Sequence, residues 1–549
     1  MQIYGDTSCE LRIECLAREL LYKTQDLPDL ASLRATLIGC GQLEQLVWDS
    51  ENVPEALRRC ASEATDHAAA AWYATWSPHQ PRAPRVSWSV ERELGSLRLL
   101  LNQLGAAGAA TGVLKTPEGF AFYALYPEQY AAAAIAHMNG HRQARGVRHV
   151  LGLRSIGTTL SAAVAVVLRA AQIDFRRCTV RPHGHPFDRQ LELQTSFDEC
   201  DLALVVDEGP GLSGSSFFSV ARALDGLGVA SSRQAYFCAH AAGPGSMATE
   251  QTREFWRLAE RHTAACGECA ISAAGSLTDT LRVELSRQFD QPVVGLEDIS
   301  AGRWREHACA RARSWPAAYP QFERPKLLAH LADGQRLLLK FYGQVLRRDP
   351  LSCDLQWSDV AAAQQIATGC SRVTRIHGYV ARAWLEGERL TSDDKSPALL
   401  EALAIFLGRR GWQRLTNDPV AVNAWYGASG PLGPGEWLKL ASGSLHKLPE
   451  TLTGYDHTAI AAEPLGWDLA AAVLEWQLTE HESERLLALF RRYSGIEVAR
   501  GELSPYLARY ARFHAAKATF CAQQASGDEA ERLLADARRY AAKLEELEP

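Results

Sequence analysis

Apolar runs of strand length recur in the central part of the chain, and each leads through a polar turn into a helical pattern. These runs are His149–Leu153, Leu202–Val206 and Gln234–Ala239. Runs of about five apolar residues suit strands that are buried on both faces, as in parallel sheets. Helical patterns at Leu160–Ala171 and Phe217–Leu227 alternate with them. This alternation predicts an α/β domain with a parallel sheet.

The regions on either side follow different patterns. Leucines recur at helix-like spacing from about residue 9 to 75, which predicts a helical N-terminal segment. Beyond residue 320, two β-like runs meet at Asp333-Gly334, a hairpin signal, and the rest is largely helical. We expect a helical segment over 1–79, a parallel-sheet domain over 80–305, and an α+β domain over 320–549. Within the central domain, Phe120 and Phe122 suggest a short strand, and Pro127 opens a helix.

Composition narrows the classes of function. The 549 residues include 47% hydrophobic and 22% charged residues, and the net charge is −6. This balance is typical of a globular protein and gives no general attraction to nucleic acid or anionic membranes. No apolar run reaches the length that spans a membrane. Thirteen cysteines, an odd number, suit reduced thiols, so we expect a cytoplasmic protein. The chemistry of Cys266-x-x-Cys269 stays open, because a zinc site needs two more ligands.

The stretch Leu202–Val220 carries the strongest chemical signal. Asp207 and Glu208 follow its apolar strand, and a glycine- and serine-rich turn then leads into a helix. Ligands of open α/β sheets bind at the carboxyl ends of strands. A helix N-terminus offers backbone N–H groups to a phosphate, and carboxylates hold hydroxyls or a metal-bound sugar phosphate. Together these features predict a site for a phosphorylated sugar.

This stretch resembles the PRPP-binding motif of type I phosphoribosyltransferases. The resemblance implies that Asp207 and Glu208 act as the acidic pair, engaging the ribose hydroxyls or, through PRPP, a Mg²⁺ ion. The loop is one residue longer than is usual in that family, so the division of roles between the two acids stays open. By the same resemblance, the 5′-phosphate would bind at Gly211, Ser213, Gly214, Ser215 and Ser216.

A second strand–loop–helix unit follows His149–Leu153, and in this family the corresponding loop receives the pyrophosphate. The resemblance carries that role to Arg154, Ser155, Gly157 and Thr158. A guanidinium suits this role because it forms paired hydrogen bonds to phosphate oxygens. The family often has a mobile loop that closes over the pyrophosphate. Its candidates here are Arg181, His183, His185 and Arg189.

The region over roughly 320–515 resembles the aminoglycoside-phosphotransferase branch of the kinase-like fold. Lys340 matches the strand lysine that holds ATP phosphates, and Asp468 lies in a segment similar to the D-P-x-x-D-L-A stretch. The family's H-x-D-x-x-x-x-N catalytic loop has no counterpart at 443–450. The nearest acid–base pair, Asp456-His457, has a different spacing. We therefore expect Mg²⁺ as a cofactor and leave ATP open as a second one.

Three hypotheses follow. The first is Mg²⁺-dependent transfer of a phosphoribosyl group from PRPP to a small acceptor, with release of pyrophosphate. The second is a non-catalytic regulatory protein that binds PRPP or a nucleotide. The third is a small-molecule kinase acting through the C-terminal domain. The acceptor and the oligomeric state, including a homo-oligomer, stay open.

Overall fold

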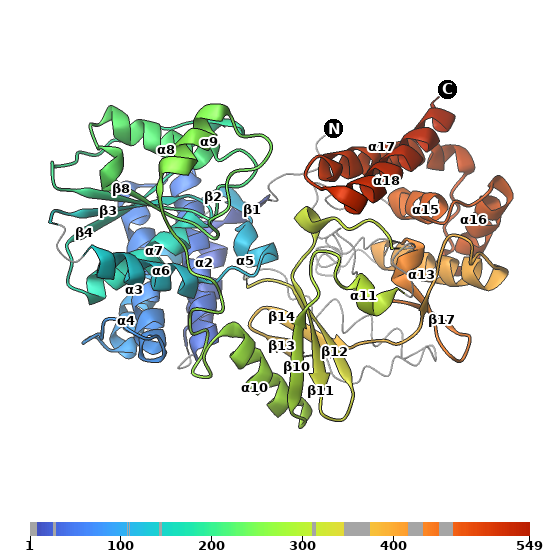
Figure 1. Ribbon diagram of the computed structural model, residues 1–549, viewed down its shortest axis with the longest axis horizontal. Coiled ribbons are helices and arrows are strands. Elements are labelled where there is room, and N and C mark those ends of the chain that lie inside the picture. Colours follow the sequence, from blue (N-terminus) through green and yellow to red (C-terminus); the bar gives the residue numbers. More distant parts are fainter. Residues whose placement is uncertain are drawn as a thin grey trace. The chain divides into compact units, whose positions relative to one another are not determined.

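The structure is a computed structural model that describes residues 8–25, 29–106, 108, 110–141, 145–309, 315–344, 374–415, 432–448 and 465–548. The chain forms two compact units (Figure 1). The N-terminal unit comprises Asp6–Pro292 and Gly343–Leu346. The C-terminal unit comprises Val293–Tyr342 and Arg347–Pro549, with Met1–Gly5.

The N-terminal unit is built around a five-stranded parallel sheet in the order β4-β3-β7-β8-β9. The predicted α/β class with a parallel sheet is therefore confirmed. Its strands are β3 (Arg148–Leu153), β4 (Phe175–Val180), β7 (Leu202–Val206), β8 (Gln234–Phe237) and β9 (Glu260–His262). Two small antiparallel pairs accompany it, β1 (Ser8–Arg12) with β2 (Thr111–Lys115) and β5 (His183–His185) with β6 (Asp188–Gln190).

Helices cover both faces of this sheet. The helices of this unit are α1 (Ile13–Lys23), α2 (Leu30–Asp49), α3 (Glu55–Trp76), α4 (Val90–Gly105), α5 (Glu118–Phe122), α6 (Pro127–Gly140), α7 (Gly157–Ala170), α8 (Ser215–Gly226), α9 (Glu250–Leu258) and α10 (Leu277–Phe289). Figure 1 shows α8 and α9 on one face, with α6, α7 and the N-terminal helices on the other.

Alternate side chains of the central strands face opposite layers. Leu204 and Val206 of β7 pack into the cluster of α7 and the N-terminal helices, whereas Ala203 and Val205 pack against α8. The helices that follow β3 and β7 therefore lie on opposite faces. The strand order thus reverses direction between β3 and β7, and at such a point the two loops diverge and leave a crevice.

Some elements differ from the sequence-based expectations. The segment with Phe120 and Phe122 is a helix, α5, because Pro117 precedes it and both rings point into the core. The chain begins its described part with strand β1 rather than a helix. The helices of the 1–79 segment share one hydrophobic core with β3 and β7, so they belong to the same compact unit. The strand at Val293–Asp298 pairs antiparallel with Lys326–Leu331, outside the sheet of the N-terminal unit.

The C-terminal unit contains a five-stranded antiparallel sheet, a three-stranded sheet and a helical part. The strands are β10 (Val293–Asp298), β11 (Lys326–Leu331), β12 (Arg336–Phe341), β13 (Thr374–Ile376), β14 (Tyr379–Ala383), β15 (Glu388–Arg389), β16 (Trp437–Lys439) and β17 (Leu445–Lys447). The helices are α11 (Arg305–Ala308), α13 (Pro397–Leu415), α15 (Leu465–Glu475), α16 (Glu480–Ser494), α17 (Arg500–Ala522) and α18 (Gly527–Leu547). The predicted hairpin at Asp333-Gly334 is confirmed: it joins β11 to β12, and Gly334 has φ +88°. Across the described residues, no helix is both long and apolar enough to cross a membrane.

Candidate functional site

The acidic pair lies at the carboxyl end of β7, where the strand order reverses. The Asp207 backbone N–H donates to the Phe237 carbonyl over 3.2 Å, and the Ala239 N–H donates to the Glu208 carbonyl over 3.0 Å. The Tyr130 hydroxyl, from α6, donates to the Asp207 carbonyl over 2.8 Å. The backbone of both acids is thus fixed from β8 and α6, which leaves the side chains at the edge of the sheet.

Three carboxyl groups share this edge. Burial, together with the nearby Glu118, raises the pKa of Asp207 to about 7, although a hydrogen bond from Glu208 and the charge of Arg181 oppose the shift. Burial also raises the pKa of Glu208 well above its ordinary value, and Glu118 and Asp207 add to that effect. The Gly119 N–H at the start of α5 donates to Glu208 over 2.8 Å. Because carboxylate oxygens are the ligands that Mg²⁺ prefers, the Asp207 and Glu208 side chains fit a bound cation or ribose hydroxyls.

The loop after the acids is a tight turn that delivers the chain into α8. The Gly214 N–H donates to the Pro210 carbonyl over 2.8 Å, and Gly211 and Gly214 have φ of +59° and +66°. These left-handed conformations favour glycine. The N-cap residue of α8, Gly214, has no side chain that could accept a hydrogen bond from the helix. The first N–H of the helix, that of Ser215, donates to Ser213 Oγ over 3.3 Å. The N–H groups that follow in the first turn suit an anion.

The loop serines contact the β5–β6 hairpin. Ser213 and Ser215 are buried, and the Ser215 hydroxyl donates to the Pro186 carbonyl over 2.8 Å. The Ser213 hydroxyl donates to Ser215 Oγ over 3.0 Å. Ser216 stands in the first turn of α8 and is half-buried. The hairpin tip is thus fastened to the predicted phosphate loop.

The predicted pyrophosphate loop lies beside the acids, after β3. Arg154 Nε donates to Asp49 Oδ1 over 2.9 Å, and its guanidinium lies 5.8 Å from the ring centre of Trp48. Arg181 pairs with the same Asp49 carboxylate. Two cations therefore share one anion from α2, which leaves net positive charge next to the acidic edge. Sequence reasoning missed Asp49 and Trp48, because only tertiary packing brings α2 to this loop.

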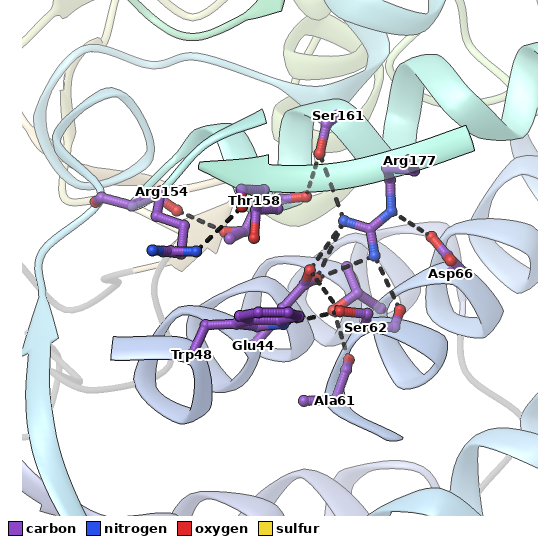
Figure 2. Close-up of polar contacts among 12 residues, drawn as sticks. Glu44, Trp48, Ala61, Ser62, Asp66, Arg154, Thr158, Ser161 and Arg177 are labelled. Carbon is purple, nitrogen blue, oxygen red and sulfur yellow. Dashed lines mark hydrogen bonds and ion pairs between the residues drawn. The ribbon is translucent and has the colours of Figure 1, made fainter. Parts of the chain in front are cut away.

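The other residues of this loop shape the backbone at the start of α7. The Thr158 hydroxyl donates to the Ser155 carbonyl over 2.5 Å and closes the first turn of α7. A Cβ on Gly157 would lie 2.7 Å from the Val206 carbonyl oxygen, so only glycine allows α7 to start this close to β7. Figure 2 shows Thr158 between Arg154 and a further arginine, Arg177, with Ser161 linking Thr158 to Arg177.

Arg177 of β4 anchors the N-terminal helices to the sheet. Its guanidinium lies 3.1 Å from Glu44 of α2 and 2.6 Å from Asp66 of α3 (Figure 2). It also donates to the Ser62 carbonyl over 2.9 Å. The side chains of Arg177 and Glu44 are 3% and 1% exposed. This buried network positions α2, and hence Asp49, against the loop of Arg154.

The candidates for a mobile loop separate into two groups. Arg181 lies at the acidic edge, whereas His183, His185 and Arg189 belong to the β5–β6 hairpin. Both histidines are exposed, and Arg189 donates to the Gly184 carbonyl over 2.9 Å within the hairpin. The structure therefore brings Arg181 to the site through Asp49 and leaves both histidine side chains facing solvent.

Further residues of this edge were not expected from the sequence. Glu118 and Tyr130 lie on α5 and α6, which precede the first of the predicted apolar strands, β3. A signal for Glu118 exists: a proline followed by an acid marks the start of a helix. Tyr130 gives no signal, because its hydroxyl contacts the backbone of a residue far along the chain.

In the C-terminal unit, Lys340 and Asp468 lie on different kinds of element. Lys340 is buried on β12, with Nζ 5.6 Å from the ring centre of Tyr342. Asp468 is buried within the first turn of α15. The segment 443–448, where the catalytic-loop motif is missing, contains strand β17. Asp456-His457 lies outside the described residues.

Comparisons with known proteins yield partial likenesses only. No protein-family model matches the sequence, and no curated protein matches it significantly. A choline kinase from Streptococcus pneumoniae has 13% identity and a TM-score of 0.25, over 48% of this chain and 99% of that chain. A macrolide 2′-phosphotransferase type I has 13% identity and a TM-score of 0.25, over 48% and 97%. An ethanolamine kinase from Plasmodium vivax has 10% identity and a TM-score of 0.25, over 40% and 81%.

These three solved structures are kinases or phosphotransferases by name. Their TM-scores are too low to fix the arrangement of either unit of this chain. The kinase-like interpretation of the C-terminal unit therefore depends on its own residues.

Proposed function

We propose that the N-terminal unit binds PRPP with Mg²⁺ and transfers its phosphoribosyl group to a small acceptor, releasing pyrophosphate. One observation carries this proposal. Asp207 and Glu208 stand where the strand order reverses, between the N-terminus of α8 and the arginine pair at Asp49. An anion site, an acidic pair and a cationic site in this order match the three parts of PRPP.

Each part of the site takes one part of the substrate. The backbone N–H groups at the start of α8 take the 5′-phosphate, and the serine hydroxyls exchange their bonds to Pro186 for bonds to phosphate oxygens. Asp207 and Glu208 accept hydrogen bonds from the ribose hydroxyls. Arg154 and Arg181 take the pyrophosphate, with Asp49 holding both guanidiniums in position.

The reaction breaks the bond between ribose C1 and the pyrophosphate oxygen and forms a bond from C1 to the acceptor, which gives up a proton. The protein positions the groups and stabilises charge rather than forming covalent bonds. Mg²⁺, held near Asp207 and Glu208, would neutralise charge on the departing pyrophosphate. The acceptor is a nucleobase or another small nucleophile.

The test is a calorimetric titration of PRPP into the protein, with and without Mg²⁺. We expect Mg²⁺-dependent binding that Asp207→Ala/Glu208→Ala abolishes. Glu199→Ala is the matched control, because Glu199 is an exposed acid just before β7 and should leave binding unchanged. Failure of the intact protein to bind PRPP, alone or with candidate acceptors, would contradict the proposal.

Release of pyrophosphate separates the enzyme from a PRPP sensor. An enzyme releases pyrophosphate when PRPP is incubated with a panel of nucleobases and small amines. A regulatory protein binds PRPP and releases none with any member of the panel.

A second candidate function is small-molecule phosphorylation by the C-terminal unit. The observation that favours it is the placement of Lys340, a buried lysine on the middle strand of a five-stranded antiparallel sheet. A buried ammonium suits the phosphates of a nucleotide. Lys340→Met should abolish ATP binding, whereas Lys439→Met, at an exposed position of β16, should not. Equal ATP affinity of both variants and the unaltered protein would remove this candidate.

A further inference from the structure

A second polar cluster lies where α6 meets β9, the edge strand of the parallel sheet. His137 and His141 are four residues apart on α6 and so lie on one face of the helix. Glu260 and His262 are two residues apart on β9 and so point to one face of the sheet. Within the described part of the chain, His137, His141 and Glu260 form the one group of three or more ligand side chains whose donor atoms all approach within 4.8 Å.

The distances in this cluster suit a single small cation. Oε1 of Glu260 lies 3.7 Å from His137 Nδ1, 3.4 Å from His141 Nε2 and 2.7 Å from His262 Nε2. His137 Nδ1 and His262 Nε2 are 2.9 Å apart. A tetrahedral zinc ion with bonds of about 2.0–2.2 Å separates neighbouring ligand atoms by about 3.3 Å. The two distances from Glu260 to His137 and His141, 3.7 Å and 3.4 Å, lie close to that value.

Proton positions alone satisfy these contacts poorly. A neutral imidazole carries one proton, so His262 Nε2 either donates to Glu260 or accepts from His137. A neutral His262 therefore cannot satisfy both neighbours, whereas a cation held by His137, His141 and Glu260 lets His262 Nε2 donate to Glu260 alone.

The surroundings hold at least one ligand in the orientation that coordination needs. His141 Nδ1 lies 3.1 Å from the His137 carbonyl oxygen, so it donates there and leaves Nε2 unprotonated toward Glu260. Metal-binding histidines generally donate their other ring N–H in this way. The side chains of His141 and Glu260 are each 39% exposed, which gives an ion access from solvent, whereas His137 is 5% exposed.

We propose that His137, His141 and Glu260 form a binding site for Zn²⁺, with His262 donating a hydrogen bond to Glu260 from beside it. Two imidazoles and one carboxylate select zinc over Mg²⁺ or Ca²⁺, which prefer oxygen ligands. The three ligands come from α6 and β9, so the ion ties the last turns of α6 to β9. The site does not depend on PRPP binding.

The test is a zinc titration of the chelator-treated, full-length protein by calorimetry. We expect one equivalent of zinc, a thermal unfolding temperature that rises with Zn²⁺ and not with Mg²⁺, and an affinity at least about 100-fold lower in His141→Ala and Glu260→Gln. His79→Ala is the matched control, because His79 is exposed and distant in sequence. Circular dichroism establishes that each variant folds.

Two further measurements test whether the zinc binds at this cluster and with which geometry. Cys266→Ser/Cys269→Ser should keep the zinc, because the two cysteines are absent from the cluster, and loss of the zinc in this variant would overturn the proposal. Substitution with Co²⁺ should give the intense visible absorption of a tetrahedral site. Zinc bound equally by the unaltered protein, His141→Ala and Glu260→Gln, or not bound at all, would also overturn it.

Discussion

The carboxyl edge of the parallel sheet and the Lys340 region of the C-terminal unit differ in how they gather polar side chains. At the edge, charged groups from α2, β4 and β7 and their loops meet, and Asp49 alone joins two arginines. Lys340 instead lies within one strand, beside the ring of a residue two positions later. A parallel sheet directs several loops to one edge, whereas an antiparallel hairpin places its residues locally. The sheet edge therefore brings together more charged side chains that can act on one ligand than the Lys340 region does.

The largest effect is expected from the buried network that supports this edge. Arg177→Met leaves Glu44 buried without its cation and should cost about 3–5 kcal/mol in the free energy of unfolding. Arg303→Met in the C-terminal unit breaks an exposed pair with Asp298 and should cost less than about 1 kcal/mol. Hydrogen exchange followed by mass spectrometry measures both units separately. Similar losses for the two variants would contradict the structural role of Arg177.

The close approach of α7 to β7 gives the second effect. Gly157→Ala places a Cβ 2.7 Å from the Val206 carbonyl oxygen and 3.1 Å from the Gly152 carbonyl carbon, so we expect a loss of about 3 kcal/mol and weaker PRPP binding. Gly501→Ala in α17 of the C-terminal unit meets nothing within 4 Å and should stabilise that helix by about 0.5–1 kcal/mol. Denaturant titration compares them. An unchanged midpoint for Gly157→Ala would show that the two elements can separate at no cost.

The acidic pair predicts a dependence of stability on pH. The folded-state pKa of Asp207, about 7, exceeds its ordinary value of 3.8, so the folded protein binds a proton that the unfolded chain releases between these two values. Stability from this group is complete at low pH and is lost as the pH rises toward 7. Between pH 5 and 7 the loss is about 2 kcal/mol, and Asp207→Asn should remove it.

The matched position in the other unit is Asp298. Burial favours its neutral form, but hydrogen bonds from Ser300 and the charge of Arg303 outweigh burial and lower the pKa. Asp298 is therefore ionised in both states between pH 5 and 7, and Asp298→Asn should leave the slope unchanged. Unfolding is measured without Mg²⁺ or PRPP. The same slope in Asp207→Asn and the unaltered protein would exclude the raised pKa.

Local patterns in the sequence predicted the elements but not the contacts of the site. The apolar runs located β3, β7 and β8, and the glycine-rich turn located the start of α8. Phe120 and Phe122 misled, because aromatic residues suit a strand and a buried short helix equally well. Asp49, Glu118 and Tyr130 reach the acidic edge only through packing of α2, α5 and α6. A single sequence does not specify such long-range neighbours.

The smallest effect concerns one of these unpredicted neighbours. Tyr130→Phe removes the part-buried hydrogen bond to the Asp207 carbonyl, which should cost about 1 kcal/mol. Tyr493→Phe in the C-terminal unit removes an exposed hydrogen bond to Glu401 and should cost less than about 0.5 kcal/mol. If Tyr130 positions the acidic pair, its variant also weakens PRPP binding several-fold. A loss of stability without a change in PRPP affinity would assign Tyr130 to packing alone and leave β8 as the support of Asp207.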